Sequence, residues 1–212
     1  MGPIRTGFFY GALAAVVALV AEFYFLVLDP SETAGWVLAV VGSYRTRLAL
    51  AAFLFLGILA ALRMRPVRLD AGVSYRSLLL RDGALAATVV AIVVGLVLSL
   101  TTLLQATVFA DDMRAYAREA APEIVSYVNG TREEIQDRRR EEGQSPEEVG
   151  DVPPAADVSE VEESLGPPAP RDLGRSLANF VLRAVLLGTI GGFVGLLRGR
   201  SKADPDGTPG PG

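Results

Sequence analysis

The chain has 212 residues, half of them apolar, and a formal net charge of −4. It contains neither Cys nor His, which excludes disulfides and thiolate nucleophiles and removes the usual general base and the commonest transition-metal ligand. The apolar residues gather in blocks of about 20, the length that crosses a ~30 Å hydrocarbon layer. We therefore expect an integral membrane protein with no catalytic residues, no metal site and no cofactor.

The first apolar block, residues 7–28, is interrupted only by Glu22. Arg5 precedes the block, as a basic residue does in a signal peptide. However, the apolar run continues through FYFLVL and offers no convincing small-x-small cleavage site. We expect an uncleaved membrane helix.

Three further blocks complete the predicted set of membrane segments. The second, residues 34–62, is broken by SYRTR, so it is either one long helix or an interfacial piece, AGWVLAVVG, followed by a short crossing. The third block covers residues 83–109, and the fourth covers residues 176–197. The predicted fold is all-α, a bundle of four transmembrane helices.

Basic residues at the ends of the blocks predict the orientation, since cytoplasmic loops of membrane proteins carry an excess of Lys and Arg. Residues 63–82 hold five Arg against two Asp, and Arg198, Arg200 and Lys202 follow the last block. On the other side, residues 110–172 hold 17 acids and 7 bases, a formal charge of −10. We expect both termini in the cytoplasm.

Small residues at helical spacing predict how the helices pack, because lipid gives apolar helices no hydrophobic reason to associate. The fourth block carries overlapping GxxxG patterns that begin at Gly188 and Gly191. No strand precedes GTIGGFVG, so a packing surface is favoured over a phosphate-binding turn. The residues expected at helix contacts are Gly11, Gly95, Gly188 and Gly192.

Four polar residues fall at one predicted depth, about 21–24 Å from the cytoplasmic ends of their helices. They are Glu22, Arg47, Ser99 and Arg183. An isolated charge there costs at least ~2.5–3.5 kcal/mol on insertion scales, so these groups should pair or reach water. Glu22 could pair with Arg183, with Arg47 as a third member, or Arg183 could extend outward to the lipid headgroups. Ordinary interfacial flanking is favoured for Arg45 and Arg47.

This polar layer has a structural and a functional interpretation. It could fix the register of the helices, or it could form the ion site of a small transporter or channel around Glu22. We expect no second buried acid in the helices, and no unwound half-helix is apparent in the sequence. These features favour the structural interpretation.

Residues 111–142 are predicted to be helical, with apolar residues at three- and four-residue spacing. Pro122 is expected to kink or restart this helix. Gly130 suits a helix end, and Thr131 with Glu134 suits the capping box of a new helix. The residues expected on an outer interaction helix are Met113, Tyr116, Ile124 and Tyr127.

The rest of the external segment, residues 144–172, is rich in Pro and acids and is expected to be a mobile linker. Arg138–Arg140 lie among glutamates on the external side, so we expect no nucleic-acid partner. The domain organisation is three transmembrane helices over residues 1–109, the acidic segment over 110–172 and a fourth helix over 173–197. A disordered cytoplasmic tail covers residues 198–212.

Together with this layout, one stretch resembles an uncharacterised bacterial membrane-protein family of the domain-of-unknown-function kind. The stretch is AGVSYRSLLLRDGALAATVVAIVVGLVLSLTTLLQATVFADDMRAYARE. The resemblance implies two close membrane helices and a third that runs directly into an acidic external helical segment. A fourth membrane helix with a short basic tail follows. The resemblance implies no known activity and no site residues. With the orientation argued above, we expect a bacterial cytoplasmic membrane protein.

The predicted role is non-enzymatic. We expect a scaffold or accessory subunit whose outer helix meets an unidentified membrane-protein partner or a second copy of the chain. Membrane lipids are the other expected partner. The alternative is a small transporter or channel that uses the charged layer around Glu22.

Overall fold

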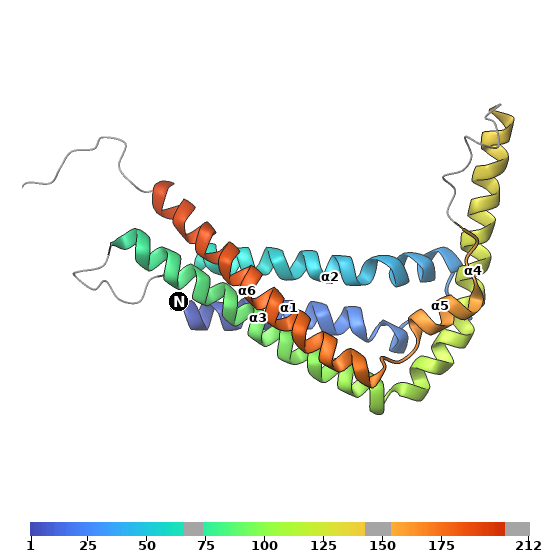
Figure 1. Cartoon of the computed structure of the whole chain (residues 1–212), viewed down its shortest axis with the longest axis horizontal. Helices are drawn as coiled ribbons and strands as arrows, with labels where there is room; N and C mark the ends of the chain where they lie inside the picture. The colour runs from blue at the N-terminus through green and yellow to red at the C-terminus, as the bar shows by residue number, and fades with distance from the viewer. Residues whose placement is uncertain (66–73, 143–153, 202–212) are drawn as a thin grey trace, which may run out of the picture. The chain divides into compact units, whose positions relative to one another are not determined.

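A computed structural model of the chain (Figure 1) describes residues 1–65, 74–142 and 154–201. Residues 143–153, which belong mostly to the predicted linker, and residues 202–212 of the predicted tail lie outside the described residues. Part of the arginine-rich loop between the second and third blocks also lies outside them.

The described residues form helices and no strand, which confirms the predicted all-α class. Four helices are long and apolar enough to cross a membrane, the fourth of them through its segment Ala178–Arg198. The chain is therefore compatible with a multi-pass integral membrane protein. The helices are α1 (Pro3–Glu22), α2 (Gly35–Arg63), α3 (Tyr75–Thr107), α4 (Ala110–Glu141), α5 (Val158–Leu165) and α6 (Pro170–Ser201), and the 3₁₀ turn η1 (Tyr24–Leu26) follows α1.

The bounds of the apolar helices differ from the predicted blocks. α1 ends at Glu22 and not at residue 28, because the next residues turn and bury Tyr24 and Phe25 in an aromatic cluster. α2 is one unbroken helix of 29 residues, which decides between the two predicted arrangements of the second block. α3 begins at Tyr75, eight residues before the predicted start.

α4 is a single helix of 32 residues, so the predicted end and restart near Gly130 are wrong. Pro122 lies inside the helix, where proline costs about 3 kcal/mol. Buried contacts of Ala120, Ala121 and Ile124 beside it offset that cost. The Thr131 hydroxyl does not cap a new helix but donates to the carbonyl of Tyr127 at 2.9 Å, four residues earlier in the same helix.

The chain forms two compact units, each with a core of its own. We call them the glycine-rich unit (Met1–Leu19, Ala49–Leu100, Leu173–Gly212) and the aromatic unit (Val20–Leu48, Thr101–Asp172). Helices α1, α2, α3 and α6 contribute residues to both units.

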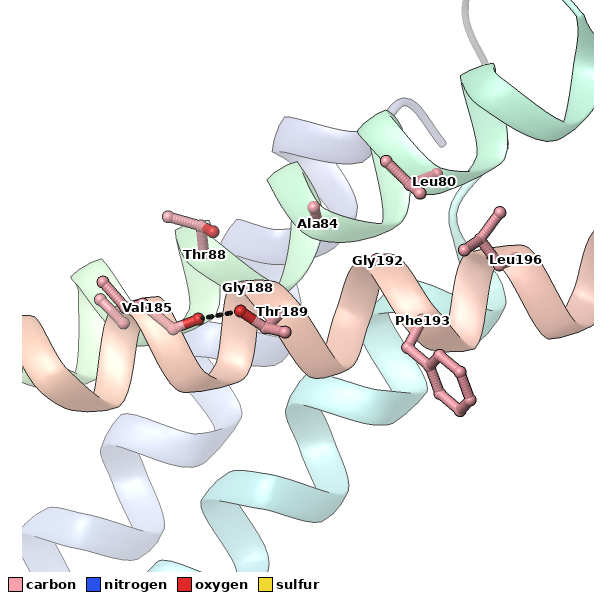
Figure 2. A pocket seen from close by; sticks show the side chains of 10 residues that line it. Leu80, Ala84, Thr88, Val185, Gly188, Thr189, Gly192, Phe193 and Leu196 are labelled. Atoms are coloured by element: carbon pink, nitrogen blue, oxygen red, sulfur yellow. Dashed lines mark hydrogen bonds between the residues drawn. The ribbon is translucent and has the colours of Figure 1, made fainter.

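In the glycine-rich unit, α3 and α6 lie with their backbones in contact. A Cβ atom added to Gly83 would lie 2.6 Å from the carbonyl oxygen of Gly191, and one added to Gly195 would overlap the carbonyl oxygen of Leu79. Farther along, a Cβ at Gly188 would lie 2.6 Å from the Thr88 hydroxyl oxygen. Figure 2 shows this face, where Gly188 and Gly192 of α6 run beside α3. This packing leaves no room for side chains and sets the two helices antiparallel.

α1 packs on another face of α3 through two further glycines. A Cβ at Gly7 would lie 2.7 Å from the Cβ of Val89, and one at Gly11 would lie 3.0 Å from the Cβ of Val93. The contacts advance together along both helices, so α1 and α3 run parallel. The predicted packing residue Gly95 lies against the ring of Phe180, at the other end of the unit.

Hydrogen bonds to backbone carbonyls connect the start of α1 with the ends of α2 and α6 in the glycine-rich unit. The carbonyl of Met1 accepts hydrogen bonds from the Arg65 N–H at 3.0 Å and the Thr6 hydroxyl at 3.3 Å. The Arg198 Nη1 donates to the carbonyl of Met64 at 2.8 Å. The start of α1 and the basic ends of α2 and α6 therefore lie together.

A pair of adjacent glycines tests the packing of α3 on α6. In Gly191→Ala the new methyl would overlap the Cβ of Ala87 and lie 2.7 Å from the carbonyl oxygen of Gly83. We expect the variant to lose about 1–3 kcal/mol of unfolding free energy in detergent, as overpacked cores do. The control is Gly192→Ala, whose Cβ would meet that of Ala84 at an ordinary 3.5 Å. Equal stability of the two variants in a denaturant titration would contradict this packing.

Candidate functional site

The aromatic unit is built on the first half of α4. Figure 1 shows α5 lying along α4, and both α5 and η1 contact it. Met113, Tyr116 and Ile124, predicted to face a partner, are only 4, 5 and 8% exposed and belong to the core of the unit itself. Tyr127 is 42% exposed. Three of the four residues of this apolar stripe are therefore covered by this chain.

The segment that returns from α4 is ordered where the structure describes it. The side-chain amide of Asn129 donates to the Ala156 carbonyl at 3.1 Å, and its oxygen accepts from the Ala156 N–H at 2.9 Å. Asp157 then caps α5, and hydrogen bonds from the Ser159 hydroxyl and N–H lower the pKa of its carboxyl. Leu165 is buried in the core. The prediction of a mobile linker is therefore wrong for residues 154–165.

Aromatic rings line the core of this unit. The rings of Tyr24 and Tyr116 meet edge to face with centroids 5.3 Å apart. The ring of Phe109 lies 5.4 Å from that of Phe23 and 6.2 Å from that of Phe25. These rings come from η1 and its flank, from α4 and from the residue just before α4. The cluster therefore holds together two stretches that are distant in the sequence, residues 23–25 and residues 109–116.

Arg45 of α2 extends into this cluster. Its guanidinium carbon lies 4.0 Å from the centre of the Tyr24 ring, a cation–π arrangement. Nε and Nη1 of Arg45 are buried without a hydrogen-bond partner, and so is the hydroxyl of Tyr24. Buried polar groups are nearly always paired, so these three atoms need an explanation.

Glu22 has a partner that the sequence analysis missed. Nε2 of Gln105 donates to the Glu22 carbonyl oxygen at 2.9 Å and lies 3.4 Å from its carboxylate. Gln105 is buried, and its amide satisfies a carbonyl that the end of α1 leaves without a helical partner. The sequence signal for this partner was Gln105 itself, an uncharged amide inside the third apolar block. A search for charged residues in the blocks does not find it.

The residues of the predicted polar layer are divided between the two units. Glu22 and Arg47 belong to the aromatic unit, whereas Ser99 and Arg183 belong to the glycine-rich unit, so the pairing of Glu22 with Arg183 stays a prediction. Arg47 is exposed, 5.5 Å from the Tyr44 ring centre. The hydroxyl of Ser99 donates to the Gly95 carbonyl at 2.9 Å within α3, and Arg183 is half-buried.

Asp82 is a second buried acid, contrary to expectation. Because α3 begins at Tyr75, Asp82 lies within the helix, where it is 2% exposed. Its carboxylate accepts from Nε of Arg81 at 3.0 Å. The sequence analysis had placed Asp82 in the arginine-rich loop, because that block appeared to begin at the next residue.

An open groove of about 640 Å³ runs between α3 and α6 in the glycine-rich unit (Figure 2). Its lining is mostly apolar. The hydroxyl of Thr189 in its wall donates to the Val185 carbonyl at 2.9 Å, drawn as a dashed line in Figure 2.

The described residues contain no group of three Asp or Glu side chains that could hold a metal ion. No family model, curated protein or solved structure matches the chain. Function must therefore be argued from the geometry of this chain, and the family resemblance stays an expectation.

The two buried phenols predict an alkaline limit to stability. Burial raises the pKa of Tyr24, with Arg45 opposing the shift and Glu22 adding to it. Burial, and then Tyr24, raise the pKa of Tyr116, with Arg45 again opposing. The native phenols keep protons that unfolded tyrosines lose near pH 10, so their contribution to stability is present below pH 10 and falls as the pH rises above it.

A phenolate absorbance titration of the full chain in detergent checks this limit. We expect a fraction of the tyrosine signal to appear only as the aromatic unit unfolds. The double variant Tyr24→Phe/Tyr116→Phe should lack that late fraction. If the late fraction is the same size in both proteins, the two phenols are not its source.

Proposed function

We propose that the chain is a non-enzymatic scaffold or accessory subunit of a membrane complex in the cytoplasmic membrane of a bacterium. Helices α1, α2, α3 and α6 anchor it in the membrane. The far half of α4, after Asn129, is presented to a partner protein on the external side.

The length of α4 beyond its own packing carries this proposal. The helix continues from Gly130 to Glu141, about 18 Å at 1.5 Å per residue, past the point where Asn129 holds the returning chain. Figure 1 shows this end extending beyond α5 within the same unit. Ile135 exposes an apolar side chain within this stretch, and Tyr127 and Val128 expose theirs just before Asn129. An exposed apolar strip on a helix is the feature that helix-in-groove recognition uses.

The exposed half of α4 keeps its helical form with local ion pairs. Arg138 contacts Glu134 at 3.0 Å, and Arg140 contacts Asp137 at 3.3 Å. Such exposed pairs contribute only about 0.2–0.5 kcal/mol each. A helical stretch this short is marginal in water, so binding to a partner helix or groove would stabilise it. The expected partner presents an apolar strip flanked by charges of both signs.

The arginine distribution supports the external placement of α4. Arg63, Arg65, Arg81 and Arg198 lie near helix ends that the sequence places on one side of the four crossings. The excess of basic residues favours the cytoplasm for that side. α4 follows α3 after two residues, at the other end of that helix.

Crosslinking in native membranes, followed by pull-down and mass spectrometry, tests the role of α4. We expect Tyr127→Ser/Ile135→Ser to reduce recovery of a specific partner about tenfold, since two apolar anchors are lost. Glu133→Gln, an exposed change on the same stretch, should leave recovery unchanged. Recovery of the chain alone, or equal recovery with both variants, would contradict the accessory role.

A further inference from the structure

The buried guanidinium of Arg45 lacks an acceptor. Two of its nitrogens, Nε and Nη1, are buried and unpaired, and the neighbouring hydroxyl of Tyr24, a residue only 6% exposed, is unpaired as well. Stacking on the Tyr24 ring stabilises the positive charge but accepts none of these hydrogen bonds. An uncompensated buried charge is unfavourable, so this donor set suits an anionic acceptor.

The groups around Arg45 do not neutralise its charge. Glu22 is near enough to affect the pKa of Tyr24, but its carboxylate makes no ion pair with Arg45 within 4 Å. Gln105 holds Glu22 through both its carbonyl and its carboxylate. Tyr116 is a buried phenol. The guanidinium of Arg45 therefore lies over the Tyr24 ring and forms no ion pair with Glu22.

The position of Arg45 along α2 places it near a membrane surface. It lies 18 residues before Arg63, the last residue of α2, or about 27 Å along a straight helix. The hydrocarbon layer is about 30 Å thick, so when Arg63 is at one surface Arg45 is close to the other. Trp36 and Tyr44 are exposed on the same part of α2, as aromatic side chains are at the headgroup level.

We infer that Arg45 and Tyr24 form a binding site for a phosphate oxyanion, supplied by the phosphodiester of a phospholipid headgroup. Arg45 as a residue is half-buried, and Nη2 is the one guanidinium nitrogen that is not among its buried, unpaired atoms. The planar guanidinium suits phosphate oxygens, and the Tyr24 hydroxyl supplies a further donor. The site shares no residue with the exposed strip of α4. The phosphate site and the proposed partner of α4 can therefore be tested independently.

Arg47 provides a matched control for this site. It is two residues along α2 from Arg45, and residues at that spacing do not face each other on a helix. Arg47 is exposed and lies 5.5 Å from the Tyr44 ring centre. Replacing it removes the same charge at the same depth without touching the Arg45–Tyr24 site.

Lipid retention by the full chain tests the assignment. The protein is placed in nanodiscs of phosphatidylcholine with phosphatidylglycerol and then released into detergent for native mass spectrometry. We expect phosphatidylglycerol to stay bound to the wild type and to Arg47→Gln. Its retention should fall about tenfold in Arg45→Gln and by a smaller factor in Tyr24→Phe, since Arg45 supplies the charge-assisted bonds.

A second arm separates the lipid from a soluble source of the same chemistry. Inorganic phosphate is titrated against the detergent-solubilised wild type and Arg45→Gln. We expect no Arg45-dependent binding of phosphate at concentrations where the lipid is retained. Binding of free phosphate that depends on Arg45, without lipid retention, would overturn the headgroup as its source.

Folding of the variants is controlled separately. Arg45→Lys keeps the charge but loses the planar, stacked guanidinium, so it should retain less lipid than the wild type even if Arg45→Gln does not fold. Equal loss in the Arg45 and Arg47 variants would overturn the site, as would equal retention of lipid by the wild type and Arg45→Lys.

Discussion

The backbone contact between α3 and α6 is the constraint on which the glycine-rich unit depends. Lipid does not drive apolar helices together, so their association relies on close van der Waals contact. Gly83 and Gly191 provide it, because a Cβ on either residue would lie under 3 Å from the carbonyl oxygen of the other. α3 also packs on α1 through Gly7 and Gly11. α3 is thus the helix that joins two others in this unit, and its small residues cannot be enlarged on either face without separating a pair.

The aromatic unit depends on different forces. Its core combines rings and aliphatic side chains from η1, α2, α4 and α5, and burial of large side chains replaces close backbone contact. Gln105 completes the end of α1, where Glu22 leaves a carbonyl without a helical partner. The side-chain amide of Gln105 stabilises this helix end. Arg45 is the part of this unit that packing does not account for.

Local features of the sequence predicted local features of the fold. Block length and glycine spacing are properties of one segment, so the four apolar helices could be identified from them. Contacts between segments are not local. Nothing in the spacing of Met113 and Tyr116 says whether their own chain or another covers them, and the partner of Glu22 lies 83 residues away at Gln105. Gly130 was predicted to end a helix, but α4 continues through it. The low helix propensity of one glycine is outweighed by the helical residues on both sides of it.

That same glycine bears on how α4 combines its two parts. The helix is covered by its own unit as far as Ile124, and Asn129 fixes the returning chain just before the exposed half begins. Gly130 follows at once, and apart from its own turn of helix nothing lies within 4 Å of where its Cβ would be. Glycine weakens a helix by about 1 kcal/mol relative to alanine, so α4 is weakened locally at this residue. A partner bound to the far part of α4 therefore meets this weakened turn before the aromatic core around Tyr116 and, beside it, the unpaired guanidinium of Arg45.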